Sequence, residues 1–266
     1  MKNIILFLSL IFFTACSSGN KDVNLVKVGY IGESDRVIWE EVIKQVASDN
    51  IQIELVSFGD YLLPNQALND GDIDLNNFQH YAFFNNEVET KGYQLTAIAD
   101  TCLAAMNIYS QNISNVNEVK EGDKVAIPND PSNGGRALKV LEAAGLIKLK
   151  DKNIANPELK DISENPLNIE IVEVDAGSIY SLLPDVACAV INCNFALNFG
   201  LNPDKDSIFK DNPSNYADKN YINIIAARTE DKDNEIYKKI VNAYQSEEVK
   251  NIYSKDFKGA YIAVWE

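Results

Sequence analysis

Apolar and polar residues alternate at two different periods along this chain, and the two periods predict strands and helices in turn. Residues 26–30 and 51–55 are apolar at every second position, as in a strand with one buried face. Between them, apolar residues recur at every fourth position over 38–46, which predicts a helix that Ser34 or Asp35 can cap. A strand, a helix and a strand in this order predict a βαβ unit with parallel strands.

The alternation continues to the end of the chain and predicts an α/β fold. We expect helices over 62–69, 81–91, 136–144 and around 236–244, strands over 72–75, 93–99, 124–128, 169–174, 187–191 and 221–227, and a loop-rich stretch over 192–207.

Two lobes fit this order of elements better than one long sheet. The apolar extended segments 103–109 and 221–227 flank the middle of the chain and are natural crossings between lobes. We therefore predict a first lobe over 25–105, a second over 106–222 and a return to the first over 223–266. Two crossings form a hinge, and small ligands favour the cleft between hinged lobes.

The N-terminus has the pattern of an export signal. Lys2 precedes an apolar run over 4–13, which is too short to span a bilayer, and small residues lead to Cys16. This resembles the bacterial lipobox and predicts a signal peptide over 1–15, lipidation of Cys16 and a flexible tether over 16–24. The chain would then be exported and held by lipid at the inner or the outer membrane. The alternative is an ordinary signal peptide with an incidental cysteine.

Net charge narrows the classes of partner. The chain carries 39 acidic and 24 basic residues, a formal charge of −15, and removing the signal peptide takes away Lys2 alone and gives −16. Nucleic acid binding needs clustered Lys and Arg, so nucleic acid is not expected as a partner. The same surplus disfavours attachment to anionic lipid through the protein surface, so membrane contact should come through the lipid anchor.

The cysteines beyond Cys16 do not form a metal-binding motif. Cys102, Cys188 and Cys193 are an odd number and show no CxxC or Cys/His spacing. If Cys188 and Cys193 share a strand, they point to opposite faces and cannot pair. We interpret all three as small buried apolar residues, and leave a disulfide with Cys102 open.

Catalytic machinery and resident cofactors are not expected. His80 is the single histidine, and we find no nucleophile, phosphate-loop or dinucleotide-binding motif. The segment 70–74 begins like a calcium loop, but Leu75 and Tyr81 replace the required Gly and Glu. We predict a turn there, no metal site, and no enzyme. A hydrolase using His80 is the weakest of the alternatives.

Several side chains could together hold a small zwitterion. The aromatic residues Tyr61, Phe78 and Phe83 gather with His80 near predicted strand ends. The stretch 129–136 joins a strand to a helix, and its Asn-Gly-Gly permits positive φ, so its amides and the Arg136 guanidinium could receive a carboxylate.

Uncharged amides at Asn192 and Asn223 could receive an ammonium group. Each residue also has a structural interpretation, in which the rings are core, His80 is a structural histidine, Arg136 pairs with an acid, and the asparagines cap or turn the chain.

These segments resemble the NlpA family of methionine-binding lipoproteins. The similar segments run in the family's order over most of residues 26–253 and cover 58–65, 77–80, 127–138, 144–149 and 189–192. The resemblance implies a two-lobed periplasmic-binding-protein fold of type II with the ligand in an interlobe cleft. It also implies that the chain is the receptor of an ABC importer, with permease and ATPase subunits as partners.

The resemblance also implies roles for eight residues. Arg136 would hold the ligand carboxylate, and Asn192 and Asn223 would receive the amino and carboxylate groups. The side chains around the thioether would be Tyr61, Phe78, His80 and Phe83, and Asn133 completes the predicted set. L-Methionine is the expected ligand, with a methionyl dipeptide or a related amino acid as alternatives. A surface antigen or adhesin with the same fold is the alternative of another class.

Overall fold

Strands β1 (Asn24–Ile31) and β2 (Ile51–Phe58) are parallel neighbours in a sheet, and helix α1 (Arg36–Val46) connects them. This arrangement confirms the predicted βαβ unit. The protein is described here from a computed structural model, which covers residues 23–212, 219–257 and 260–266. The predicted signal peptide, Cys16 and most of the predicted tether lie outside the described residues.

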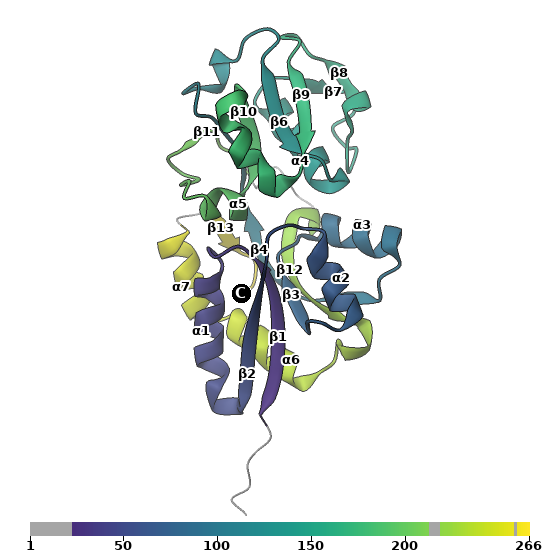
Figure 1. Ribbon diagram of the computed structural model, residues 1–266, viewed down its shortest axis with the longest axis vertical. Helices are drawn as coiled ribbons and strands as arrows, with labels where there is room; N and C mark the ends of the chain where they lie inside the picture. The colour runs from purple at the N-terminus through teal and green to yellow at the C-terminus, as the bar shows by residue number, and fades with distance from the viewer. Residues whose placement is uncertain (1–22, 213–218, 258–259) are drawn as a thin grey trace, which may run out of the picture.

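The other strands and α-helices follow in chain order (Figure 1). They are α2 (Leu63–Asp70), β3 (Leu75–Asn77), α3 (Tyr81–Lys91), β4 (Leu95–Ala104), β5 (Met106–Tyr109), β6 (Lys124–Pro128), α4 (Pro131–Ala143), β7 (Lys148–Leu149), β8 (Ile162–Glu164), β9 (Glu170–Val174), β10 (Cys188–Asn192), α5 (Cys193–Asn198), β11 (Ser207–Phe209), β12 (Ile222–Arg228), α6 (Glu235–Tyr244), α7 (Glu247–Asp256) and β13 (Tyr261–Ala263).

The first lobe is a six-stranded sheet in the order β13-β4-β12-β3-β1-β2, covered by helices on both faces. Alternate residues of β12 decide which helices cover which face. Ile225 and Ala227 pack with α1, α6 and α7, whereas Ile224 and Ala226 pack with α2 and α3. In Figure 1, α1 and α7 accordingly lie on the opposite side of this sheet from α2 and α3.

The second lobe is a five-stranded sheet in the order β11-β5-β10-β6-β9, with a small β7-β8 pair beside it. Val125 and Ile127 of β6 pack against α4, while Ala126 faces α5 and the 3₁₀ segment η4 (Ala176–Asp185). The cluster on the Ala126 face also contains side chains of the first lobe, among them Tyr61 and Phe83. The two lobes therefore share an apolar contact.

The chain leaves the first sheet after β4 and enters the second at β5, one residue later. It returns between β11 and β12, and residues 213–218 of that connection lie outside the described residues. Because β12 belongs to the first sheet, the predicted crossing over 221–227 is a strand of the first lobe rather than the crossing itself. The lobe limits 25–105, 106–222 and 223–266 stay a prediction.

Two other predictions about local structure are wrong. Helix α4 begins at Pro131 and not at Arg136, and Gly134 and Gly135 lie inside it rather than in a turn with positive φ. A Cβ on Gly134 would approach Pro128 O to 2.8 Å, and one on Gly135 would approach Asn156 Cα to 2.8 Å. The two glycines therefore serve close packing. The stretch predicted as loop after Asn192 begins with α5.

Within the described part of the chain, helices fall short of the length and apolar character that a bilayer crossing requires.

Candidate ligand-binding site

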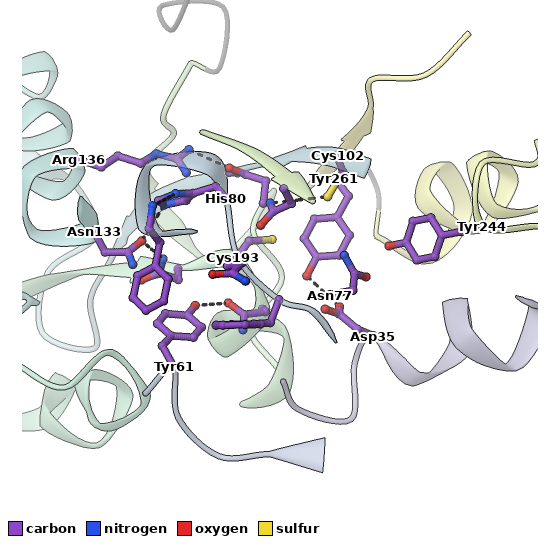
Figure 2. Close-up of a pocket in the computed structure, with 18 residues that line it drawn as sticks. Asp35, Tyr61, Asn77, His80, Cys102, Asn133, Arg136, Cys193, Tyr244 and Tyr261 are labelled. Atoms are coloured by element: carbon purple, nitrogen blue, oxygen red, sulfur yellow. Dashed lines mark hydrogen bonds between the residues drawn. The ribbon is translucent and has the colours of Figure 1, made fainter. Parts of the chain in front are cut away.

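The eight side chains predicted to bind a ligand all line one pocket between the lobes (Figure 2). They are Tyr61, Phe78, His80, Phe83, Asn133, Arg136, Asn192 and Asn223. The space among these side chains is about 600 Å³ when the open solvent at its mouth is included. Tertiary structure thus brings the predicted set together, and the contact of each residue with a ligand stays a prediction.

Asn133 of α4 connects the two lobes at the centre of this pocket. Its Oδ1 accepts a hydrogen bond from Asn192 Nδ2 at 2.7 Å and lies 3.2 Å from His80 Nε2 in the first lobe. Its Nδ2 donates to Asp130 at 2.9 Å, which leaves the amide in one orientation. Asn133 therefore holds the His80 ring and the Asn192 amide in place.

His80 is a neutral imidazole with a defined tautomer. Its Nδ1 accepts from the backbone N–H of Phe83 at 3.1 Å and so caps α3, which leaves the proton on Nε2, facing Asn133. Burial, and secondly the charge of Arg136, lower the pKa of His80 to about 3. At neutral pH the ring therefore offers one N–H donor and an apolar edge, and it carries no charge.

Arg136 is almost completely enclosed, with 2% of the residue exposed. It pairs with an acid, as its structural interpretation has it, but that acid is the buried Asp211, which the sequence did not identify. Its Nη2 lies 3.2 Å from Asp211 Oδ2 and donates to Ala104 O at 2.8 Å. Its guanidinium lies over the Tyr221 ring, 4.8 Å from the centroid. Asp211 is buried too, and its N–H donates to Asn107 at 2.9 Å. The guanidinium is therefore held rigidly at the end of the pocket.

Three rings form an apolar corner of the pocket. Tyr61, Phe78 and Phe83 lie with their ring centroids 5.8–5.9 Å apart. The Phe195 ring of the second lobe packs at a tilt against Tyr61, with the ring centroids 5.0 Å apart, and the Tyr61 hydroxyl donates to Asn194 Oδ1 at 2.7 Å. Rings at these separations leave faces and edges to which a thin apolar or sulfur-containing chain can bind.

The backbone N–H of Asn133, in the first turn of α4, is already in use. Asp130 caps this helix, and its Oδ1 accepts from the N–H of Asn133 at 2.9 Å. The prediction that the amides at the start of α4 receive a ligand carboxylate is therefore wrong at Asn133, because the chain's own carboxylate occupies that position. In the pocket, Arg136 is the side chain with a permanent positive charge.

Two buried amide atoms of the pocket have no hydrogen-bond partner among the described residues. They are Asn192 Oδ1, an acceptor, and Asn194 Nδ2, a donor. Both residues are at most 9% exposed, and a buried polar atom without a partner costs about 1–3 kcal/mol. A ligand that carries both a donor and an acceptor could recover this cost.

Sequence reasoning missed ten residues that line the same pocket. They are Asp35, Asn77, Gln79, Cys102, Ala104, Ala105, Cys193, Asn194, Tyr244 and Tyr261. Asn77, Gln79 and Cys193 are neighbours in sequence of predicted residues, and Asn194 lies two residues from Asn192, so these four could have been found by that proximity. The other six are Asp35 before α1, Cys102 and Ala104 of β4, Ala105 directly after it, Tyr244 of α6 and Tyr261 of β13, and their approach to the pocket depends on the packing of the whole first lobe.

Cys102, Cys188 and Cys193 are buried and free, which confirms their interpretation as small apolar residues and leaves no disulfide with Cys102. Cys193 begins α5, so it does not share a strand with Cys188. The argument that the two side chains point to opposite faces of one strand therefore started from a wrong premise. Burial raises the pKa of Cys102 and of Cys188 to about 12, so these thiols are unreactive at neutral pH.

Residues 23–212, 219–257 and 260–266 contain no group of three or more His, Cys, Asp or Glu side chains that could hold a metal ion.

The chain is similar to known proteins over nearly its whole length. The family model described as NlpA lipoprotein matches residues 26–265. The D-methionine-binding lipoprotein MetQ of Salmonella typhi is 42% identical over 254 residues, which are 94% of this chain and 92% of that protein.

Two solved structures have the same fold. The nutrient binding protein of Burkholderia cenocepacia bound to methionine has a TM-score of 0.84 at 38% identity, over 90% of this chain and all of that one. The substrate binding protein of a methionine transporter from Streptococcus pneumoniae also has a TM-score of 0.84, at 34% identity over 91% and 96% of the two chains. This chain belongs to the NlpA lipoprotein family.

Proposed function

We propose that this protein captures methionine between its lobes and presents it to an ABC importer. The observation that carries the proposal is the pocket itself, in which a buried guanidinium, neutral amides and a corner of three rings face one space. Relatives named for methionine binding or methionine transport have the same fold at 34% identity or more.

Each part of a methionine molecule has a matching part of the pocket. A planar guanidinium can serve two carboxylates on different edges, so Arg136 can hold the ligand carboxylate while it stays beside Asp211. The thioether would lie among Tyr61, Phe78 and Phe83, where sulfur–ring contacts contribute roughly 0.3–1.5 kcal/mol each. Asn192 Oδ1 and Asn223 would receive polar groups near the α-carbon.

The N-terminal sequence supports a location of this protein at a bacterial membrane. Lipidation of Cys16 would hold the protein at a bacterial membrane, and the tether over 16–24 would let the lobes reach the permease and its ATPase subunits. The names of the relatives support capture and delivery over a role as an adhesin. They are named as binding proteins, which supports binding without catalysis here.

Mass spectrometry of small molecules released from the purified protein tests the proposal. Methionine or a close analogue should be recovered from the unaltered chain. Arg136→Ala should carry none and should show at least a hundredfold weaker affinity in calorimetry, because a buried ligand carboxylate would lack its cation. Recovery of a sugar or an inorganic anion, or an unchanged affinity in the variant, would refute the proposal.

A further inference from the structure

The pocket extends beyond the predicted binding residues to an end formed by Asp35, Asn77, Cys102, Tyr244 and Tyr261, here called the Asp35 end. Figure 2 shows Arg136 and Asp35 on opposite sides of the pocket, with Cys193 between them. Asp35 is the acidic side chain among the pocket residues, so the pocket has one permanent cation at one end and one carboxyl group at the other.

Asp35 does not serve the helix that it precedes. It occupies the N-cap position of α1, yet its side chain accepts no capping hydrogen bond. Such a cap stabilises a helix by about 1 kcal/mol. The carboxyl group instead accepts from the Tyr261 hydroxyl at 2.8 Å and lies 3.4 Å from the Ser34 hydroxyl. The hydroxyls of Tyr261 and Ser34, and not the amides of the helix, thus decide where this carboxyl group points.

The groups that face Asp35 are neutral at physiological pH. Its charge raises the pKa of the Cys102 and Cys193 thiols and of four tyrosine hydroxyls. These tyrosines are Tyr61 before α2, Tyr244 of α6, Tyr253 of α7 and Tyr261 of β13. Burial in this apolar and uncharged surrounding raises the pKa of Asp35 to about 7.

Arg136 does not compensate Asp35. The Arg136 charge and the Asp35 charge both act on the Cys193 thiol between them, but Arg136 is absent from the influences on Asp35. Among the described residues, therefore, no basic side chain shifts the Asp35 pKa. The hydroxyls of Tyr261 and Ser34 favour the ionised form of this partly buried carboxyl group, but burial outweighs them. A cation from outside the chain would stabilise the ionised form further.

We infer that Asp35 binds an ammonium group of the ligand at the end of the pocket opposite Arg136. The inference rests on the proposed function for the carboxylate end of the ligand and adds a charged partner for its other end. An ammonium group would form charge-assisted hydrogen bonds with the carboxylate, which are roughly twice as strong as those to a neutral amide. Asn192 Oδ1, without a partner in the described chain, provides a neutral acceptor in the same pocket.

The ammonium group could be the α-ammonium of a free amino acid or the N-terminal ammonium of a dipeptide. Two pairs of ligands distinguish these sources: methionine with its deamino analogue 4-(methylthio)butanoate, and glycyl-methionine with its N-acetylated form. Calorimetry would compare the full chain in detergent with Asp35→Asn, which keeps the shape and capping ability of the side chain. The matched control is Glu33→Gln, which removes the same charge from a side chain that is 67% exposed and lies outside this pocket.

Asp35→Asn should weaken binding at least tenfold for the ammonium-bearing member of one pair and less than twofold for its ammonium-free member. The pair that shows this difference identifies the source of the ammonium group. Equal losses for both members of each pair, or no loss in either pair, would overturn the assignment of Asp35 while the proposed function stands. If the unaltered protein bound none of the four ligands, the proposed function would fail and this inference with it.

Proton release gives a second readout that a purely structural role of Asp35 would not change. Binding of an ammonium group favours the ionised carboxylate, so ligand binding at pH 6 should release protons into the buffer. Binding enthalpies measured in buffers of different ionisation enthalpy would report the number released. The release should disappear in Asp35→Asn and persist in Glu33→Gln, and an identical number in all three proteins would contradict the inference.

Discussion

Nη2 of Arg136 and Oδ2 of Asp211 lie 3.2 Å apart, and both side chains are at most 2% exposed. The pair joins α4 to the chain segment that leads from the second sheet back to the first. Removing one member of a buried ion pair leaves the other uncompensated and commonly costs about 3–5 kcal/mol. Arg136 thus has a structural partner in addition to its predicted ligand.

Variants of this pair distinguish an effect on folding from an effect on ligand binding. Arg136→Met should lower the free energy of unfolding by about 3–5 kcal/mol, since Asp211 would remain buried without its cation. Adding Asp211→Asn should restore most of that stability, but it should not restore methionine binding. Urea denaturation and calorimetry on the two variants measure both effects. A double variant that recovers binding would show that Arg136 does not contact the ligand.

Asp35 makes the ligand-free protein less stable as the pH rises. Between the ordinary pKa of 3.8 and the folded value of about 7, the folded protein keeps a proton that the unfolded chain has released. The free energy of unfolding therefore falls through this range and is constant above it. Asp35→Asn should be more stable than the unaltered protein at pH 8 by a few kcal/mol.

The difference between these two proteins should become small near pH 4, where both side chains are neutral in the folded state and the aspartate of the unfolded chain is only partly ionised. Denaturation curves at pH 4 and pH 8, recorded after bound ligand has been removed by unfolding and dialysis, test this. A constant difference at both pH values would point to a packing effect instead.

His80 has the opposite pH dependence. Its pKa in the folded protein is about 3, below the ordinary 6.5. Between these pH values the unfolded chain binds a proton at this residue, and the folded protein does not. Stability from this residue is present above pH 6.5 and is lost as the pH falls toward 3. His80→Asn keeps an acceptor at the N-cap of α3 and should flatten the stability profile over this range. If the variant follows the profile of the unaltered protein, other groups cause the acid sensitivity.

Gly134 should resist replacement by alanine although it lies within a helix. Alanine normally stabilises a helix interior by roughly 0.5–1 kcal/mol over glycine. Here its Cβ would lie 2.8 Å from the backbone oxygen of Pro128, which cannot move without shifting β6. We expect Gly134→Ala to be destabilising by about 1–3 kcal/mol in thermal unfolding. Gly59→Ala is the control, because its Cβ would meet nothing within 4 Å, and equal effects at both sites would contradict the packing argument.

Gly32 of the first lobe and Asn198 of the second lie in close contact. Asn198 of α5 accepts from the N–H of Ser34 at 2.9 Å, and a Cβ on Gly32 would lie 1.5 Å from Asn198 Nδ2. Gly32→Ala should therefore hinder closure and weaken ligand affinity at least tenfold, and Asn198→Ala in the same chain should recover part of it.

Gly71→Ala is the control for backbone strain in the comparison of Gly32 variants. Gly32 and Gly71 both have positive φ, at +73° and +83°, but Gly71 has open space around it. Calorimetry with methionine should show an affinity close to that of the unaltered protein for Gly71→Ala. A similar loss in both glycine variants would mean that strain, and not the contact with Asn198, is responsible.

Local pattern was sufficient for much of the fold. Alternation over 26–30 and 51–55 and the fourfold spacing between them predicted the parallel pairing of β1 with β2. The sequence pattern gave a wrong prediction where the local conformational preference of glycine competed with packing. The glycines after Asn133 suggested a turn, but the space beneath α4 requires residues without a Cβ, and the helix continues through them.

The sequence by itself determined which residue types could hold a ligand, because a single histidine, an arginine near the start of a helix and clustered aromatic residues are visible without coordinates. Only the tertiary structure decided that Asp211 would pair with Arg136 and that Asp35 would face the same pocket. The physical reason is distance along the chain. Asp211 lies 75 residues from Arg136, and the Tyr261 hydroxyl that holds Asp35 lies 226 residues away, so long-range packing of both sheets was needed to bring these groups together.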